Sequence, residues 1–228
     1  MDTEQADITR DIKTDLIASG AITDPSSPKG VLLAKAAHLF GERGYERTTV
    51  RDIGRAVGIL PGSIFHHFRS KDEILLTVMR ESIVLNLTRM RAALERAETL
   101  DDRLRTLIGW ELYATNGEET GEAWTVLVHE WRSLSADGQK EILGLRDEYE
   151  QLWLKVLEEA RAAGMFDIDP FILRRLLAGA LNWTSHWYRH GRGLTLDELG
   201  EEVLRLLKHQ TGSGTAGNVL GRESANQE

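Results

Sequence analysis

The chain has 228 residues and a formal net charge of −8, with 41% hydrophobic and 28% charged residues. These values are ordinary for a soluble globular protein and allow one large domain, or two smaller ones that share a core. The absence of cysteine excludes a disulfide framework and a thiolate site. No stretch approaches the roughly 18 apolar residues of a membrane span, and the acidic start lacks a secretory signal. We therefore expect a cytoplasmic protein with no membrane partner.

The first 26 residues form an acidic leader. Ile8, Ile12 and Leu16 recur at four-residue spacing, which favours a short helix in a segment that is otherwise expected to be flexible.

Helix signals run through the chain from Ser27 onward, without convincing strand alternation. Ser27 and Pro28 form an N-cap followed by proline at the first helical position, and Asp169 and Pro170 repeat this pattern. Further starts pair Ser or Thr with an acid three residues later, so that both side chains can bond free amides. These pairs are Thr49/Asp52, Ser70/Glu73, Thr99/Asp102 and Thr195/Glu198. The predicted helices cover residues 28–41, 49–57, 61–67, 71–98, 101–116, 120–134, 137–163, 170–190 and 196–209.

Basic charge is concentrated in one part of the chain. Residues 29–80 hold nine basic and five acidic residues, a formal charge of +4, so the rest must carry −12 of the total of −8. A basic module on an acidic body is expected when only one end of a protein contacts phosphate. The charge pattern therefore indicates nucleic-acid binding by residues 29–80.

Residues 49–71 contain two short helices separated by a tight turn. The first helix is predicted to end at Gly58, because glycine readily takes the left-handed conformation that stops a helix. The second follows after a few residues. This is the connection of a helix-turn-helix, whose second helix enters the major groove of DNA.

The same stretch resembles the TetR family of bacterial transcription repressors. The resemblance covers about 50 residues without gaps and is highly specific. Its segments are Phe40–Tyr45, Thr48–Ile53, Ala56–Gly58, Gly62–Phe68 and Ser70–Leu75. It implies a homodimer that reads a palindromic operator in double-stranded DNA and releases it when a small-molecule effector enters the C-terminal domain.

The resemblance also implies which residues contact DNA. Thr49 and Arg51 should meet the DNA backbone, and Phe65 and His66 the sugar-phosphate. Lys71, at a helix N-terminus, should hold a phosphate by its charge together with backbone amides. The residues expected nearest the base edges are Leu60, Pro61, Gly62 and Ser63.

This chain departs from the family at three of those positions. Leu60 stands where the family usually has Ser or Thr, so it cannot cap the reading helix, and Pro61 replaces a polar or basic residue. Phe65 replaces a common tyrosine. These changes favour apolar contacts with thymine methyl groups and recognition of DNA shape. Of the remaining residues, we expect Ile53, Val57, Ile59, Ile64 and Phe68 to be core, with His67 packed as well.

We therefore predict an all-α fold. An N-terminal three-helix helix-turn-helix domain covers residues 27–70, and a C-terminal six-helix ligand-binding and dimerisation domain covers residues 71–210. Residues 211–228 are rich in Gly, Ser and Asn and are expected to form a disordered tail.

The body resembles, more weakly, the TetR-type repressors that answer to acyl-CoA or steroid-CoA thioesters. Trp183–Leu194, Leu196–Leu199, His129–Leu134 and Leu145–Tyr149 carry this resemblance. A thioester would need cations for its phosphates, and the candidates are Arg132, Arg146, Arg175 and Arg189. The predicted ligand-binding residues are Arg132, Arg175, Asn182, Trp183 and Trp187. Helices 170–190 and 196–209 are expected to form the dimer interface, because they combine apolar stripes with small residues.

Other functions fit less well. His129 and Glu130 begin like a zinc-protease motif, but Ser133 stands where the second histidine is needed. His186 and His190 could share a helix face, which more often serves an interface than a metal. We therefore predict no enzyme activity, no cofactor and no metal. The alternative regulator is an efflux-pump repressor that senses an aromatic or cationic drug by cation–π contacts, with carboxylates such as Glu111 or Glu130.

Overall fold

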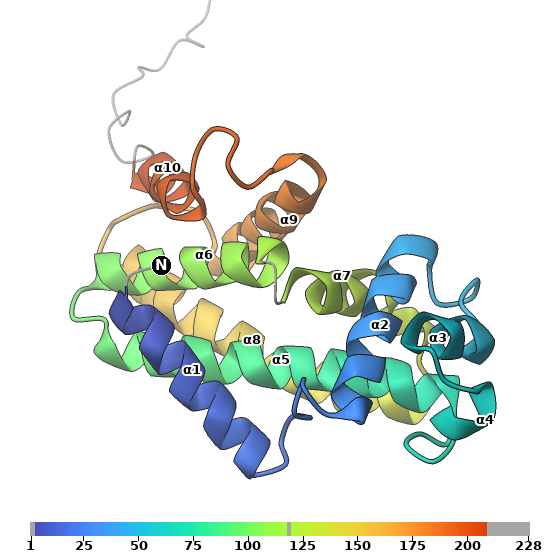
Figure 1. Ribbon diagram of the computed structural model, residues 1–228. Helices are drawn as coiled ribbons and strands as arrows, with labels where there is room; N and C mark the ends of the chain where they lie inside the picture. The colour runs from blue at the N-terminus through green and yellow to red at the C-terminus, as the bar shows by residue number, and fades with distance from the viewer. Residues whose placement is uncertain (1–2, 118–119, 209–228) are drawn as a thin grey trace, which may run out of the picture.

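The computed structural model describes residues 3–117 and 120–208. Within these ranges every regular element is helical, and the chain forms a smaller head attached to a larger body (Figure 1). The predicted all-α fold is confirmed. The predicted tail at residues 211–228 lies outside the described residues.

The leader contains a longer helix than its sequence pattern suggested. Helix α1 spans Thr3–Ala18 and packs on α5 (Lys71–Arg96). Ile12, Leu16 and Ile17 are half-buried, and Ile22 in the following turn is buried. An apolar face therefore contributes to holding the leader against the body.

The head consists of α2 (Pro28–Arg43), α3 (Val50–Val57) and α4 (Pro61–Ile64). The predicted caps are present: the Ser27 side chain accepts from the amide of Gly30, and Thr49 and Asp52 form a reciprocal capping box. Leu60 makes no side-chain cap. The predicted three-helix head is confirmed.

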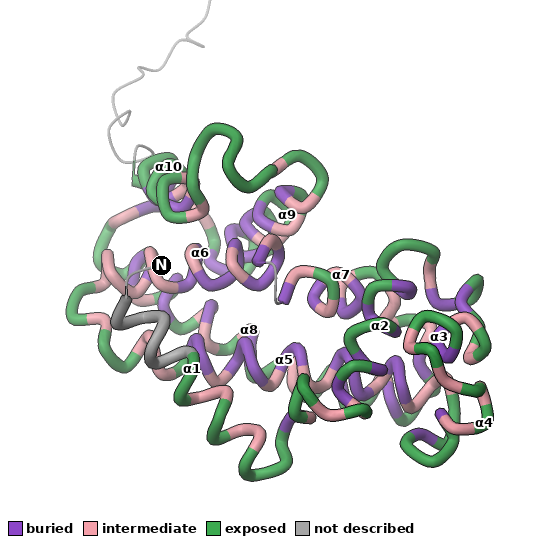
Figure 2. The backbone as a smooth tube through the Cα atoms, in the orientation of Figure 1, coloured by how far each residue is buried: buried purple, intermediate pink, exposed green. Residues whose placement is uncertain are grey.

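The body is built around α5, whose buried residues run along most of its length (Figure 2). Around it lie α6 (Leu100–Asn116), α7 (Gly121–Glu130) with the short 3₁₀ turn Trp131–Ser133, and α8 (Ala136–Ala162). Helix α7 contacts α2 as well as α5, so it joins the head to the body.

Helices α9 (Pro170–Trp187) and α10 (Leu196–Lys208) complete the body and pack on α6. Helix α9 ends three residues earlier than predicted, because Tyr188 is extended and the connection contains Gly191 and Gly193 at positive φ. The head lies at one end of α5, whereas α9 and α10 lie toward its other end (Figure 1). Among the described residues, no helix has the length and apolar character needed to cross a membrane.

Candidate nucleic-acid, dimer and effector sites

The turn between α3 and α4 presents an exposed surface. Gly58 ends α3 in the left-handed conformation, with φ at 78°. The side chains of Leu60 and Phe65 are 77% and 55% exposed, although both are large and apolar. Thr49, Arg51, Gly62 and His66 are also exposed, and Pro61 and Ser63 are half-buried. The structure thus brings eight of the nine predicted DNA contacts to one accessible part of the head.

Helix α4, the second helix of the predicted helix-turn-helix, is shorter than predicted. The α-helix covers Pro61–Ile64, and residues 65–67 continue it as tighter turns, with the amides of Phe65 and His66 bonded to carbonyls three residues back. The missing cap at Leu60 leaves this short helix dependent on packing. Ile64 and Phe68 supply that packing, since both are buried as predicted. His67 was expected to pack but is exposed, because the turn directs it away from the head.

Lys71 differs from the other predicted contacts. Its Nζ donates to the carbonyl oxygens of Tyr45 and Thr48, at 2.9 and 3.0 Å, and lies 3.9 Å from the centre of the Tyr45 ring. The ammonium therefore fixes the loop between α2 and α3 to the start of α5. Thr48, which is fully buried and bonds the carbonyls of Leu39 and Gly44, completes this attachment. The sequence reasoning assigned Thr48 no role.

A network of buried polar side chains joins four helices of the body. The guanidinium of Arg174 on α9 lies 3.5 Å from the Glu111 carboxylate on α6 and 3.1 Å from that of Glu150 on α8. Tyr149 donates its hydroxyl to Glu111 at 2.8 Å. Arg174 also stacks on Trp153, 4.4 Å from the ring. Glu111, Tyr149 and Arg174 are all nearly inaccessible, so this is a desolvated ion pair with supporting hydrogen bonds.

Burial sets the protonation of this network. The pKa of the Tyr149 hydroxyl is raised well above its ordinary value, first by burial and then by the charge of Glu111. Burial alone would lower the pKa of Arg174, but the charges of Glu111 and Glu150 outweigh it and raise that pKa. The tyrosine stays neutral and the arginine charged across the physiological range.

Asn182 extends the network to α7. Its amide nitrogen donates to Glu111 at 3.1 Å, and its oxygen accepts from the Trp124 indole at 3.0 Å and lies 3.3 Å from the Thr115 hydroxyl. Of the five predicted ligand-binding residues, Asn182 alone reaches the interior. Arg175 was predicted to bind the ligand, but the residue that points inward is its neighbour Arg174. Arg174 could have been found, because it falls on the stripe of buried residues formed by Leu173, Leu177 and Leu181.

Trp183 and Trp187 do not line the interior. They are 61% and 53% exposed and continue an apolar face along α9 with Ile172 and Leu176, which are 51% and 61% exposed. Gly179 and Ala180 lie on the same face and are exposed. Contiguous exposed apolar surface of this kind marks a contact with another molecule.

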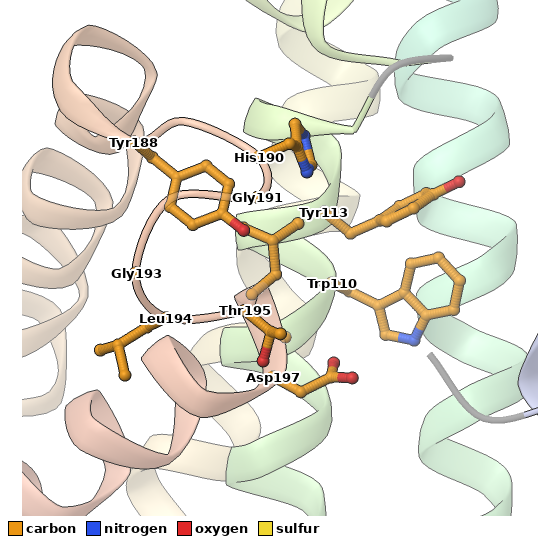
Figure 3. Close-up of a pocket in the computed structure, with 11 residues that line it drawn as sticks. Trp110, Tyr113, Tyr188, His190, Gly191, Gly193, Leu194, Thr195 and Asp197 are labelled. Atoms are coloured by element: carbon orange, nitrogen blue, oxygen red, sulfur yellow. The ribbon is translucent and has the colours of Figure 1, made fainter.

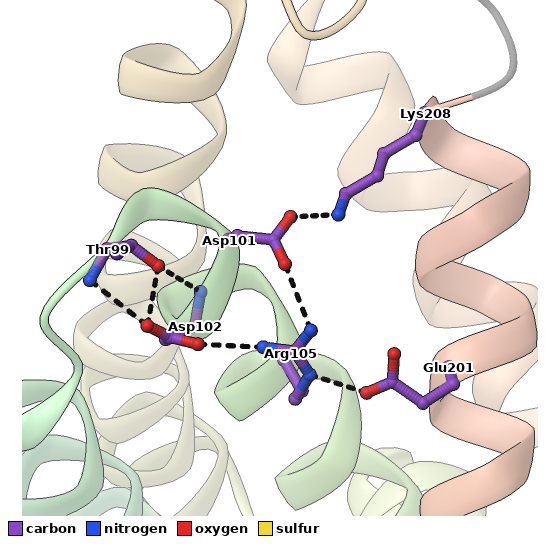
Figure 4. A network of polar contacts seen from close by, with 6 residues as sticks. All are labelled: Thr99, Asp101, Asp102, Arg105, Glu201 and Lys208. Atoms are coloured by element: carbon purple, nitrogen blue, oxygen red, sulfur yellow. Dashed lines mark hydrogen bonds and ion pairs between the residues drawn. The ribbon is translucent and has the colours of Figure 1, made fainter.

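Helix α10 is fixed beside this face by ion pairs with α6. Arg105 bonds Asp101, Asp102 and Glu201, and Lys208 pairs with Asp101 (Figure 4). Thr99 and Asp102 form the capping box of α6 within the same cluster. Leu206 of α10 is 67% exposed, so α10 also presents apolar surface.

The remaining predicted arginines lie near the surface. Arg175 is exposed, 4.7 Å from the Phe171 ring and 3.9 Å from Glu150. Arg132 and Arg146 each lie 5.7 Å from the ring of Trp131. Burial, together with the charges of Arg175 and Arg174, lowers the pKa of Arg146 despite an opposing effect of Glu150. Within the described residues, Arg146 makes no ion pair, so it offers an anion a positive charge beside an aromatic ring.

A cleft of about 360 Å³ opens between α6 and the connection from α9 to α10. Its lining includes Trp110 and Tyr113 from α6, and Tyr188, His190 and Leu194 from the connection (Figure 3). The Trp110 indole nitrogen is buried and has no hydrogen-bond partner among the described residues. An aromatic lining with a few polar groups is typical of small-molecule sites.

The described residues contain no group of three or more His, Cys, Asp or Glu side chains that could hold a metal ion. The expected pairing of His186 with His190 on one helix face is wrong, because α9 ends before His190. His186 stacks on Trp183 at 4.0 Å, and His190 bonds the carbonyl of Asn116.

Comparison with known proteins agrees with this geometry. Residues 32–78 match the family of bacterial regulatory proteins called the tetR family, and residues 76–211 match the tetracyclin repressor-like C-terminal domain. The transcriptional repressor KstR2 of Mycolicibacterium smegmatis is 31% identical over 190 residues, which cover 81% of this chain and 91% of the repressor.

Two solved structures share the fold. The ketosteroid transcriptional regulator KstR2 of Mycobacterium tuberculosis is 29% identical with a TM-score of 0.72, over 82% of this chain and 96% of that one. A protein described as the superantigen pfit is 54% identical with a TM-score of 0.73, over 87% of this chain and 98% of that one.

Proposed function

The chain belongs to the TetR family of bacterial transcriptional regulators, and from this premise we propose that it is a repressor that binds a palindromic operator as a homodimer and is released by a coenzyme A thioester. Residues 27–70 serve as the DNA-binding domain, and residues 71–210 bind the effector and form the dimer.

The observation that carries this proposal is the exposed surface of the turn between α3 and α4. Leu60 and Phe65 are more than half exposed at the two ends of the short helix α4, whereas Ile64 within that helix is buried. Around them, Thr49, Arg51 and His66 offer polar groups to phosphate. Leu60 and Pro61 meet thymine methyl groups, and the polar residues fix the orientation on the duplex. Lys71 acts indirectly, by holding the loop before α3.

The apolar face of α9, together with α10, forms the dimer interface. Two copies of this face, related by a twofold axis, form a four-helix contact in which Gly179 and Ala180 permit close approach. The twofold axis places two heads on one palindromic site.

The effector belongs to the body. The cleft beside Tyr188 offers aromatic surface for an acyl or ring system, and similarity to a ketosteroid regulator supports a ligand of that apolar class. Two places offer cations for the phosphates: Arg132 with Arg146 around Trp131, and Arg189, which directly follows Tyr188. The buried network around Glu111 joins α6 to α9. A ligand that contacts α6 therefore changes the distance between the two heads of the dimer, provided that it binds one arrangement of the heads more tightly than the other.

The same network argues against a cationic drug bound at Glu111. That carboxylate is already paired with Arg174 and accepts from Tyr149 and Asn182. A drug cation would have to displace a buried arginine.

The test is fluorescence anisotropy of labelled DNA from upstream of the gene that encodes the chain, at fixed salt. Medium-chain, long-chain and steroid CoA thioesters, the free acids and a panel of cationic dyes are titrated into the complex. Release by thioesters, but not by acids, supports the proposal. Release by dyes alone overturns the effector class and supports the efflux alternative.

Variants then locate the phosphates. Arg132→Ala combined with Arg146→Ala should abolish the response if the phosphates lie at Trp131, and Arg189→Ala should abolish it if they lie beside Tyr188. Arg161→Ala, an exposed arginine of α8, is the control. Absence of any DNA binding would overturn the proposal itself. Because the 54% identical relative is described as a superantigen and not as a DNA-binding protein, DNA binding is the first measurement to perform.

A further inference from the structure

A second cleft lies where the leader, the head and the body meet. Its volume is about 290 Å³, and its walls come from α1 with the turn after it, from α2, from α5 and from α7. Most of the lining is aliphatic: Ile22, Pro25, Leu33, Ala34, Ala37, Val78, Leu85 and Ala123. The turn at Asp24 and Pro25 packs tightly on α2, since a Cβ at Gly30 would lie 2.1 Å from the Asp24 carbonyl oxygen. The turn is therefore a fixed wall of the cleft.

One polar group that lines the cleft has no hydrogen-bond partner among the described residues. Ser82 on α5 lines the cleft at 7% exposure, and its hydroxyl makes no hydrogen bond with any described residue. One turn further along α5, the side-chain oxygen of Asn86 is also buried and unbonded. A buried hydroxyl without a partner is costly, so a site that retains one is suited to a ligand that satisfies it.

The other polar side chains of the cleft are already engaged. Thr23 donates to the Glu81 carboxylate at 2.7 Å, and Thr120 donates to the carbonyl of Tyr113 at 2.9 Å. Lys13 also has an interaction of its own. The cleft therefore offers an incoming molecule aliphatic contact, with the buried and unbonded Ser82 hydroxyl in its lining.

We propose that this cleft is a second small-molecule site, separate from the effector site in the body. Its ligand is compact, neutral and largely apolar, and carries one hydroxyl or carbonyl oxygen that hydrogen-bonds to Ser82. A charged ligand is disfavoured, because desolvating a charge among aliphatic side chains is costly. Because α2 belongs to the head and α5 and α7 to the body, the ligand fixes the head relative to the body. This last consequence, unlike binding itself, rests on the proposed function.

The test uses the full chain without DNA and two probes of similar shape. 1-Naphthol has a hydroxyl group, and 1-methylnaphthalene has a methyl group in its place; the fluorescence of each reports its binding. Ser82→Ala removes the hydroxyl of the wall. Ala34→Trp fills the cleft from an exposed position on α2, so the fold should tolerate it. Val31→Trp places the same side chain on the same helix, outside the cleft, at a residue that is 40% exposed.

We expect wild type to bind 1-naphthol more tightly than 1-methylnaphthalene. Ser82→Ala should weaken 1-naphthol by about five-fold, the value of one hydrogen bond, and leave 1-methylnaphthalene unchanged. Ala34→Trp should abolish both, and Val31→Trp neither. Binding of both probes that survives Ala34→Trp, or an equal loss of both with Ser82→Ala, would overturn the site. Adding DNA afterwards tests only whether the ligand affects the head. A chain that binds 1-naphthol but no operator DNA would contradict the proposed function, and the cleft would remain a small-molecule site.

Discussion

The two ends of the molecule both expose large apolar side chains, but in different settings. In the head, Leu60 and Phe65 flank a helix of only four residues, among polar neighbours. On α9, the exposed residues Ile172, Leu176 and Trp183 follow one another along a continuous helical face. Isolated apolar side chains in a polar surface are suited to a polar partner that carries a few methyl groups. A continuous apolar helical face is suited to a second apolar helical face. The difference supports our proposal of DNA at one end and a second copy of the chain at the other.

The largest effect is expected at the α9 end. Leu176→Glu with Trp183→Glu places two charges on the apolar face, so we expect a monomer in light scattering. Loss of the second head should weaken operator binding by a factor of about 10² to 10⁴. Leu143→Glu on α8, where the leucine is 42% exposed, is the matched control and should leave both unchanged. A double variant that remains a dimer would assign the stripe to another partner.

The next effect concerns the buried network that supports α9. Arg174→Leu leaves Glu111 in the interior without its cation, and we expect a loss of about 3–5 kcal/mol in the free energy of unfolding. Adding Glu111→Leu removes the orphaned charge and should recover much of that loss. Urea unfolding of the two variants measures both values. Equal instability of the single and double variants would show that packing of Arg174 on Trp153, not charge, matters there.

In the head, the missing cap can be restored. Leu60→Ser supplies a hydroxyl at the N-cap of α4, so we expect a gain of about 1 kcal/mol in helix stability. The same change removes an apolar contact with DNA, so operator affinity should fall although the head becomes more stable. Thermal unfolding and anisotropy on one preparation measure the two effects. If affinity rises with stability, Leu60 has no role at the bases.

Arg51 tests the polar surroundings of the head. Arg51→Ala removes an exposed charge expected to contact phosphate, and we expect the slope of log K against log salt to fall by about 1. The loss should be the same for operator and unrelated DNA. Arg161→Ala, distant from the head on α8, should leave the slope unchanged; a sequence-dependent loss at Arg51 would indicate base contact instead.

The smallest effect concerns acid. Side-chain and backbone hydrogen bonds from Thr49 lower the pKa of Asp52 below its ordinary value of 3.8, and Thr99 does the same, through its side chain first, for Asp102. A depressed carboxyl pKa adds stability above the unfolded value and loses it as pH falls through the folded value. Asp52→Asn should therefore reduce the melting temperature at pH 6 and make little difference below the folded pKa. A difference in melting temperature between wild type and Asp52→Asn that stays the same from pH 6 to below the folded pKa would contradict the lowered pKa of Asp52.

The sequence predicted the head better than the body. Capping pairs such as Thr49/Asp52 and the glycine at Gly58 act within a few residues, so their structure can be derived locally. The interior of the body depends on helix rotation. Arg174 and Arg175 are neighbours, but successive residues on a helix point about 100° apart, and only the former is buried. Trp183 was predicted to bind the ligand because its helix usually surrounds the ligand in the family, but its side chain lies on the outward face of that helix and is 61% exposed.

Reasoning by family likeness also missed local detail in the head. Lys71 resembles a phosphate contact by position, yet its ammonium is bonded to two carbonyls that no sequence pattern reveals. His67 follows the helical period that would bury it, but the chain has by then left the α-helix.

The contacts of Lys71 have a chemical consequence. Acylation of a lysine requires a neutral amine that is free to approach the acyl donor. The Lys71 ammonium is bonded to the carbonyls of Tyr45 and Thr48 and lies against an aromatic ring, so reaction would first require all three contacts to break. Lys35 is exposed on α2 and forms no such contact with the part of the chain that the structure describes. In a cell rich in reactive thioesters, acylation would therefore fall on the outside of the head and leave its attachment to α5 intact.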